Sequence, residues 1–255
     1  MRLKRIDGKI VARKIIAKGI FLISIDLMED FDNFAPGNFV MLNINDFENI
    51  LSRPFSIYSA DKRNIKLIIK TVGSVTNKLF KCSLPQDVSI VGPLGNAFPE
   101  LKGNNLIVSG GIGIVPVFEL TNRIDVEGFF AGFRTKEEIF LIEEIKKINN
   151  ISSIYISTDD GSQYYRGFIT EYLEDYLIRN REGDFNIYAC GPLPFLKKLW
   201  EISRRFNISN IFGSFETYMA CGFGVCLGCT LDTSKGYVKV CKDGPVFSLN
   251  DIFGE

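Results

Sequence analysis

The sequence predicts an α+β protein built from three consecutive parts. Residues 1–101 read as an N-terminal antiparallel β-barrel, because short strands follow one another between turn signals with no early helix. Residues 102–211 read as a doubly wound α/β domain, because buried strands alternate there with helical patterns. Residues 212–255 form a glycine-rich module in which four of the chain's six cysteines gather. We expect the three parts to pack as one body.

Five segments of the first part carry the strand signal. They are rich in Ile, Val and Phe and are separated by the turn sequences APGN, DKRN and GPLGN. The first helical pattern of the chain comes only at about residues 75–82. A run of strands without helices between them favours a small barrel. The predicted strands are KIVARKII (9–16), IFLISIDL (20–27), NFVMLNI (38–44), PFSIYSA (54–60) and IKLIIKTV (65–72).

The second part alternates between strands and helices. Helical patterns cover residues 137–148, 168–180 and 193–206. Because strands joined through helices run parallel, this order predicts a doubly wound sheet with helices on its faces. The predicted strands are NLIVSG (105–110), VEGFFAGF (126–133), SSIYISTDD (152–160) and FNIYACGP (185–192).

Glycine turns follow two of these strands, in SGGIGIVPV (109–117) and YACGPLPF (188–195). The first turn opens a helix, so backbone N–H groups and a helix N-terminus are available to a phosphate. It lacks the last glycine of GxGxxG, and a tight strand-to-helix turn explains it equally well. Both turns lie at carboxyl ends of strands in one parallel sheet, where open α/β sheets bind nucleotides. The second part is therefore a candidate nucleotide domain.

The cysteines of the last part have the spacing C-x4-C-x2-C-x11-C, at Cys221, Cys226, Cys229 and Cys241. Disulfides require an oxidising compartment. The first ten residues contain no apolar run, so we expect no signal peptide and a cytoplasmic location. The thiols are then expected to be reduced, which disfavours disulfides. Zinc sites more often pair two CxxC units or add histidines, whereas this chain has one CxxC and no histidine. A plant-type 2Fe–2S cluster uses this spacing, and we keep zinc as the alternative.

Other cysteines and glycines support this interpretation of the module. Glycines at 222, 224 and 228 allow the loop to wrap tightly and to turn N–H groups towards sulfur. Cys82 and Cys190 are isolated in the sequence, and we interpret each as a small buried apolar residue rather than a ligand.

Charge and composition exclude several classes of partner. Lys plus Arg and Asp plus Glu number 30 each, so the zero net charge gives no reason to expect nucleic acid or an anionic membrane. The sequence contains no run of 18 apolar residues, so no transmembrane helix is predicted. The chain also lacks histidine, the usual general base near neutral pH. Transfer of electrons or hydride through cofactors needs no such base, so the composition permits a redox protein.

One barrel strand, in LSRPFSIYSA (51–60), places Arg53 and Ser56 at strand spacing. Two interpretations stay open for it. It is either a surface strand with one solvated arginine, or a strand whose backbone and Arg53 meet a flavin and its pyrophosphate, with Tyr58 stacking on the flavin.

Together these motifs resemble the ferredoxin–NADP reductase superfamily. Its R-P-x-S strand matches residues 53–56, its G-G-x-G-x-x-P turn matches residues 110–116, and its C-G-P turn matches residues 190–192. A 2Fe–2S module after the C-G-P turn makes the chain most similar to the electron-transfer subunits of NAD-dependent, class 1 type B dihydroorotate dehydrogenases. That similarity runs over nearly the whole chain and is most specific in STDDGSQYYRGFIT (157–170), MACGFGVCLGCT (219–230) and KVCKDGPVF (239–247).

The resemblance implies an electron relay in pyrimidine biosynthesis. In that family a separate catalytic subunit oxidises dihydroorotate with FMN, and electrons pass through a 2Fe–2S cluster and FAD to NAD+ as the acceptor. The implied assembly is a cytoplasmic heterotetramer with two copies of each subunit. The alternatives are a flavin/iron–sulfur NAD(P)H reductase subunit of a hydrogenase- or ferredoxin-linked complex, and a zinc-stabilised binding protein.

Carried over residue by residue, the resemblance assigns roles to individual positions and assigns no catalytic acid or base. The family's G-x-G-T turn appears as residues 73–76, where Val75 replaces the second glycine; valine suits that position badly if it needs a positive φ. The cluster ligands are the four cysteines of the module. The residues implied for FAD are Arg53, Pro54, Phe55, Ser56, Ile68, Ile69, Lys70, Val75 and Thr76, and those implied for NAD are Gly110, Gly111, Gly113, Cys190, Gly191 and Pro192.

Overall fold

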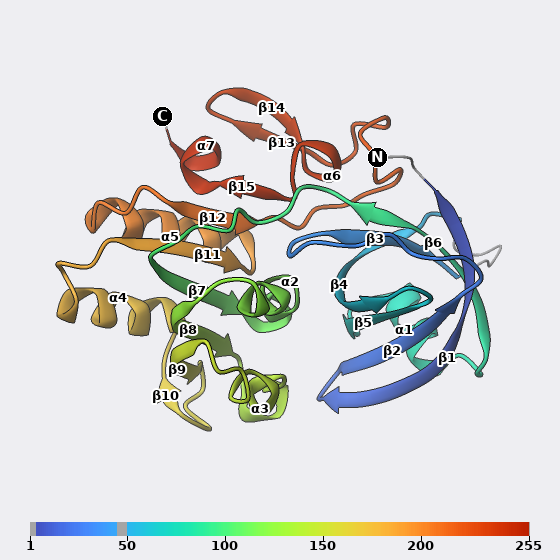
Figure 1. Cartoon of the computed structure of the whole chain (residues 1–255), viewed down its shortest axis with the longest axis horizontal. Helices are drawn as coiled ribbons and strands as arrows, with labels where there is room; N and C mark the ends of the chain where they lie inside the picture. Colours follow the sequence, from blue (N-terminus) through green and yellow to red (C-terminus); the bar gives the residue numbers. More distant parts are fainter. Residues whose placement is uncertain (1–3, 45–49, 255) are drawn as a thin grey trace.

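The computed structural model describes residues 4–44 and 50–254. Figure 1 shows a barrel beside a sheet flanked by helices, with a small C-terminal module packed along both. Within the described residues, six antiparallel strands close the barrel in the order β1-β2-β5-β4-β3-β6. The elements of this part are β1 (Arg5–Ala17), β2 (Ile20–Leu27), β3 (Phe39–Asn43), β4 (Arg53–Asp61), β5 (Asn64–Lys70), α1 (Ser74–Lys81) and β6 (Gln86–Leu94).

The strand β6 is absent from the five predicted strands, yet it closes the barrel by pairing with both β1 and β3. Val88 and Ile90 of this strand are buried and indicate its inner face. The sequence GPLGN was predicted to be a turn, but its first residues, Gly92 and Pro93, belong to the strand. The chain turns only at Gly95, where φ is +80°. A register shift in the pairing with β3 accommodates this irregular end.

The barrel interior is filled by alternate side chains, because successive residues of a strand point to opposite faces. Along β2, the side chains of Phe21, Ile23 and Ile25 are completely buried. Val75 and Leu79 add the apolar face of α1 to the same core. Each large apolar side chain buried in this way contributes about 1.5–3 kcal/mol to the free energy of unfolding.

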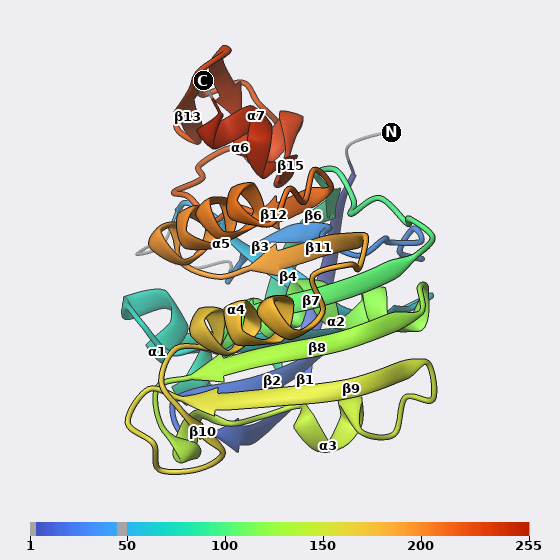
Figure 2. The ribbon, with the colours of Figure 1, turned by 90° about the vertical axis from the view of Figure 1, so that its left-hand side faces the viewer.

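The second part is built on a seven-stranded sheet in the described chain, with the order β10-β9-β8-β7-β11-β12-β15. Figure 2 shows this sheet in front of the barrel. Every neighbouring pair is parallel except β12 with β15. The strands are β7 (Asn104–Gly110), β8 (Val126–Phe133), β9 (Ile151–Thr158), β10 (Tyr165–Arg166), β11 (Phe185–Cys190), β12 (Ile211–Ser214) and β15 (Val246–Ser248).

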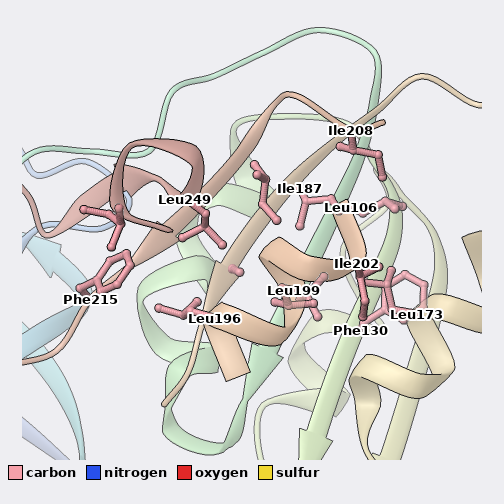
Figure 3. Close-up of a cluster of buried hydrophobic side chains, with 14 of the residues drawn as sticks. Leu106, Phe130, Leu173, Ile187, Leu196, Leu199, Ile202, Ile208, Phe215 and Leu249 are labelled. Carbon is pink, nitrogen blue, oxygen red and sulfur yellow. The ribbon is translucent and has the colours of Figure 1, made fainter. Parts of the chain in front are cut away.

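Helices cover both faces of the sheet, as predicted for a doubly wound domain. The helices α4 (Ile169–Arg179) and α5 (Leu193–Arg205) confirm two of the three predicted helical segments. They bury apolar residues at helical spacing, and Figure 3 shows Leu196, Leu199 and Ile202 of α5 packed against Ile187 of the sheet. The opposite face packs against α2 (Ile114–Phe118) and α3 (Ile142–Ile145), on the side where the barrel lies.

The helix predicted over residues 137–148 is wrong in its extent. The chain forms a short 3₁₀ turn at Lys136–Glu138 and then only the four residues of α3. Phe140, Leu141 and Ile142 are consecutive and all buried. A continuous helix would turn them about 100° apart, so it could not direct all three into one core. Leu141 adopts a φ of +62°, which breaks the helix and lets the chain bury all three.

The C-terminal module is attached to both other parts. Its strand β15 extends the seven-stranded sheet by pairing antiparallel with β12, whose four residues run parallel to β11. Leu249 is buried in the same core as α5 (Figure 3). In the described parts of the chain, no helix is both long enough and apolar enough to cross a bilayer. The remaining elements of the module are β13 (Thr230–Thr233), β14 (Gly236–Lys239), α6 (Val240–Asp243) and α7 (Leu249–Phe253).

Candidate redox site: a four-cysteine loop and two adjoining cavities

The four cysteines predicted as ligands come together in the module, and their sulfurs form two pairs. The Sγ atoms of Cys229 and Cys241 lie 3.1 Å apart, and both residues are buried. The thiol of Cys226, which is exposed, lies close enough to Cys221 to contribute to lowering the pKa of that thiol. Cys221 also lies close enough to Cys241 for its charge to raise the pKa of that thiol. One pair is therefore inside the module and the other lies towards its surface.

Backbone N–H groups of the loop point at these sulfurs. Desolvation opposes ionisation of Cys221, but the N–H groups of Cys226 and two loop neighbours, with the Cys226 thiol, outweigh it and lower the pKa to about 6. For Cys241, desolvation is the largest cause that raises the pKa, and the neighbouring Cys229 raises it further, to about 12. The N–H of Gly224 has the opposite, weaker effect of lowering it. N–H groups aimed at sulfur are the second shell expected around an iron–sulfur cluster.

Two glycines allow the loop to take this shape. Gly222 has a φ of +82° and Gly224 a φ of +86°, values that residues with a side chain rarely adopt. A Cβ at Gly222 would clash with Met41 of β3, and one at Gly224 would lie 2.8 Å from Lys242. Gly222 therefore also lets the loop sit directly on the barrel strand β3, and Gly224 lets it sit against α6.

The donor set fits a binuclear cluster better than a single metal ion. A structural zinc ion needs four ligands around a single centre. A 2Fe–2S cluster distributes four thiolates over two irons, so two sulfur pairs suit it. Cys82, at the C-terminal end of α1, and Cys190, at the end of β11, belong to neither pair.

A cavity of about 270 Å³, here called the barrel cavity, lies between the barrel, α2 and the segment after β12. Its remaining wall includes Phe215 and Met219 from that segment, so the cavity borders the chain that leads into the cysteine loop. Seven of the nine residues implied for FAD line it: Pro54, Phe55, Ser56, Ile68, Ile69, Lys70 and Thr76.

The turn before α1 departs from the family's glycine pattern without strain. Val75 lies in the first turn of α1, is not among the positive-φ residues, and is buried in the barrel core. The Oγ1 of Thr76 accepts N–H bonds from Val72 at 2.9 Å and Gly73 at 3.0 Å, and donates to the Gly73 carbonyl at 3.0 Å. In this chain the position of Val75 does not need a positive φ, because the threonine holds the turn.

Besides Val75, the structure leaves Arg53 and Tyr58 off the barrel cavity. Arg53 donates from Nη1 to the carbonyl oxygens of Leu51 at 2.8 Å and Ser52 at 3.3 Å, and it lines neither cavity described here. The ring of Tyr58 packs on Phe118 of α2, with centroids 5.1 Å apart. The expected stacking surface of Tyr58 therefore serves the contact between the barrel and the nucleotide domain.

A second cavity, of about 610 Å³ and here called the sheet cavity, lies at the carboxyl ends of β7, β8, β9 and β11. Parallel strands place their carboxyl ends at one edge, so this is where the fold is expected to bind a nucleotide. Cys190, also implied for NAD, lines neither cavity; it is completely buried, and burial followed by the charge of Glu216 raises its pKa. Five residues implied for NAD line the sheet cavity: Gly110, Gly111, Gly113, Gly191 and Pro192.

In the glycine turn after β7, two positions need glycine for different physical reasons. Gly111 has a φ of +57° with open space where a Cβ would be, so its backbone conformation favours glycine. Gly113 has an ordinary backbone, but a Cβ there would clash with the carbonyl group of Cys190. Gly113 therefore lets the two glycine turns approach each other at the floor of the sheet cavity.

Other residues of the sheet cavity were missed by the sequence analysis. Arg134 and Asp159 directly follow the ends of β8 and β9, and that position was the available signal. Burial removes the Asp159 carboxyl from water, and this desolvation is the largest cause of its raised pKa. Phe168, just before α4, and Lys198 of α5 also line the cavity. Phe168 lies in the stretch 157–170 that carried the family resemblance, whereas no local pattern marked Lys198.

The two cavities adjoin, because Lys70, Ile112 and Glu216 line both. Glu216 has open surface facing the cavities, yet its carboxyl is surrounded closely enough for desolvation to raise its pKa. Walls, volume and turn N–H groups suit a dinucleotide in the sheet cavity, whereas the smaller barrel cavity suits a ring system. The cysteine loop, the barrel cavity and the sheet cavity are thus three consecutive sites.

A closed barrel with a flavin-sized cavity, a doubly wound sheet and two pairs of thiols define a flavin- and nicotinamide-linked iron–sulfur oxidoreductase component. Family models match consecutive stretches of the chain and agree with this class. An oxidoreductase FAD-binding domain matches residues 7–98, and an oxidoreductase NAD-binding domain matches residues 107–200. The iron–sulfur cluster binding domain of dihydroorotate dehydrogenase B matches residues 216–253.

Full-length relatives narrow the class to one family. The electron transfer subunit of dihydroorotate dehydrogenase B (NAD(+)) from Lysinibacillus sphaericus is 36% identical over 96% of each chain. The probable subunit of the same name from Pyrococcus horikoshii is 38% identical over 91% of this chain and 85% of its own. The chain belongs to the family of dihydroorotate dehydrogenase B electron transfer subunits.

Solved structures support the same fold. A structure of the NADH-dependent reduced ferredoxin–NADP oxidoreductase matches with a TM-score of 0.84 and 25% identity, over 96% of this chain and 89% of that chain. The FAD/NAD-binding domain of a nitric oxide dioxygenase from Vibrio cholerae matches with a TM-score of 0.71 at 14% identity, which bears on the fold alone.

Proposed function

We propose that this chain takes electrons from the FMN-containing catalytic subunit of a dihydroorotate dehydrogenase and delivers them as hydride to NAD+ in pyrimidine biosynthesis. The observation that carries this proposal is the row of three sites: the cysteine loop sits on β3, the neighbouring β4 lines the barrel cavity, and that cavity adjoins the sheet cavity. A relay needs this order, because each site must lie next to the one that follows it.

Each site contributes through this chain's own residues. Cys221, Cys226, Cys229 and Cys241 would hold a 2Fe–2S cluster, residues lining the barrel cavity would hold the flavin of FAD, and the glycine turns would hold NAD+. When bound, such a cluster carries single electrons and FAD exchanges either single electrons or a hydride pair, whereas NAD+ accepts only hydride. The apolar walls of the barrel cavity, such as Phe39 and Phe215, exclude water from the middle site.

The docking surface is proposed to surround the cysteine loop. Phe223, Val225 and Leu227 of the loop are exposed, as is Tyr218 just before it. Exposed apolar side chains in one loop suit the core of a protein interface. The proposed assembly is a cytoplasmic heterotetramer with two copies of each subunit.

A second candidate function has one observation in its favour. The similar fold of the NADH-dependent reduced ferredoxin–NADP oxidoreductase, at 25% identity, makes a ferredoxin- or hydrogenase-linked NAD(P)H reductase subunit the alternative. Both functions use the same three sites, so they differ only in the partner that docks at the cysteine loop.

The test is to purify the chain alone and together with a candidate catalytic subunit encoded beside it. The chain alone should show flavin and 2Fe–2S signals in visible and electron paramagnetic resonance spectra, and it should oxidise NADH with artificial acceptors. Dihydroorotate-dependent reduction of NAD+ should appear only with the partner. Dihydroorotate oxidation by the single chain would refute the division of labour. If the chain reduced ferredoxin and no NAD+-linked dihydroorotate turnover appeared with the partner, the second candidate would be favoured.

A further inference from the structure

Two ion pairs fasten the nucleotide domain to the barrel beside the sheet cavity. The Nζ of Lys18 lies 2.8 Å from Oε2 of Glu137, and the Nζ of Lys70 lies 3.0 Å from Oε2 of Glu138. The backbone N–H of Lys18 also donates to the carbonyl of Glu137 at 2.9 Å. Adjacent carboxylates of one short turn after β8 therefore hold two lysines of the barrel.

The two pairs differ in exposure and in what they face. The side chains of Lys18 and Glu137 are 72% and 52% exposed, and neither residue lines a cavity described here. The side chains of Lys70 and Glu138 are only 26% and 18% exposed. Lys70 lines both cavities and Glu138 lines the sheet cavity. The inner pair alone is therefore in a position to meet a ligand.

We infer that the Lys70–Glu138 ion pair is a latch that NAD+ opens when its pyrophosphate enters the sheet cavity. This inference rests on the proposed function, in which the sheet cavity receives the nicotinamide dinucleotide. The two phosphates of the ligand offer Lys70 an alternative partner with two negative charges. Glu138 lines the same cavity, so its carboxylate both competes for Lys70 and repels the phosphates.

Other charges of the sheet cavity do not replace this arrangement. Arg134 and Lys198 supply positive charge and Asp159 and Glu216 supply negative charge, so the six charged residues of the wall balance. Among them, Lys70 lies on the side shared with the barrel cavity and is held by an ion pair across the two domains. Glu138 thus acts on the ligand through Lys70: it holds the ammonium in the ion pair until the phosphates displace it.

The experiment measures binding of NAD+ to the full, flavin-loaded chain by isothermal titration calorimetry. Glu138→Gln keeps the shape of the side chain and removes its charge, so NAD+ should bind about 3- to 10-fold more tightly than to wild type. The gain should shrink at high salt, because screening weakens the charge that was removed. Glu137→Gln, on the exposed pair that faces no cavity, is the matched control and should leave the Kd unchanged.

A double-mutant cycle separates the latch from simple repulsion. In a Lys70→Met background, Glu138→Gln should strengthen binding clearly less than it does in wild type, because no ammonium is left to release. Equal gains in both backgrounds, or unchanged or weaker binding by Glu138→Gln, would overturn the latch. Glu138→Ala repeats the test if the glutamine variant has an altered thermal transition or flavin content. If wild type itself does not bind NAD+, the proposed function fails and the latch fails with it.

Discussion

At the scale of single residues, the four cysteines of the module are not equivalent. Cys229 and Cys241 are buried within 3.1 Å of each other, whereas Cys226 is exposed. A serine hydroxyl is a poor replacement for a thiolate ligand, so each single Cys→Ser change at the four positions should abolish the 2Fe–2S absorption. The buried replacements should also lower the free energy of unfolding of the metal-free chain, because each leaves a hydroxyl in an apolar site.

The check is a visible and electron paramagnetic resonance spectrum of each purified variant. Cys82→Ser is the matched control, since Cys82 lies at the C-terminal end of α1 and belongs to neither sulfur pair. Cys190→Ser should also keep the cluster. A full cluster in Cys241→Ser would remove that residue from the ligand set.

Gly113 supplies a prediction about stability that does not depend on any bound cofactor. A Cβ at this position would clash with the carbonyl group of Cys190, and backbone atoms of the turn cannot move aside easily. Gly113→Ala should therefore lower the free energy of unfolding by about 1–3 kcal/mol, as overpacking does. Gly110→Ala is the control: its Cβ would have no neighbour closer than 3.5 Å and its φ is −116°. Chemical denaturation of both variants should show the difference, and equal stability would refute the packing role.

Sequence motifs at this scale identified residue types better than side-chain partners. The thiols and the glycine turns could be predicted, because spacing and backbone conformation are local properties. Arg53 could not be placed, because its guanidinium bonds to local carbonyl groups instead of reaching the barrel cavity. The partner of Lys70 could not be predicted from the sequence either, because Glu138 lies 68 residues away and contacts Lys70 only after the two domains pack.

At the scale of elements, α1 shows how this chain replaces a glycine of its family's turn. Val75 is buried in the first turn of α1, and Thr76 holds the preceding backbone. Val75→Gly should lower the free energy of unfolding by about 2–4 kcal/mol, from the lost apolar side chain and the added freedom of glycine in a helix. Ser74→Gly, at the exposed neighbouring position, should cost no more than about 1 kcal/mol. Urea denaturation of the two variants checks this, and equal losses would mean that burial of Val75 does not matter.

The limits of prediction at the element scale have a common cause. The five predicted barrel strands and the helices α4 and α5 are present, because their apolar periodicity is strong and continuous. The predicted helix 137–148 breaks at Leu141, where three consecutive residues must reach one core. The strand β6 was missed because Gly92 and Pro93 are turn signals locally and are tolerated in the strand only through its irregular pairing. In both places tertiary packing overrides a local preference.

At the scale of the whole molecule, the sequence could predict the parts but not their order in space. The module is joined to the sheet through β15 and to the barrel through the contact of Gly222 with Met41. These contacts connect residues far apart in the chain, and no spacing rule encodes them. They place the cysteine loop beside the barrel cavity, and they leave one side of the loop exposed (Figure 1).

That exposed side leads to a prediction about assembly. Phe223 is 39% exposed in the cysteine loop, with Val225 and Leu227 exposed beside it. If the catalytic subunit docks there, Phe223→Asp would bury a charge without a partner, and the Kd of the complex should rise by about 30-fold or more, as for loss of an aromatic anchor. The flavin and 2Fe–2S spectra of the isolated chain should not change, because the aromatic ring is not a ligand of either group.

Size-exclusion chromatography of the mixed subunits, with the dihydroorotate-to-NAD+ rate, measures the effect. Ile178→Asp is the matched control, because Ile178 is similarly exposed, at 46%, but lies on α4 of the nucleotide domain. It introduces the same charge on a surface that the proposed docking mode leaves free, so assembly should be normal. A Phe223→Asp chain that still forms the complex and sustains the normal rate would mean that the partner docks on another face, since a buried, unpaired carboxylate at the interface core cannot be neutral in energy.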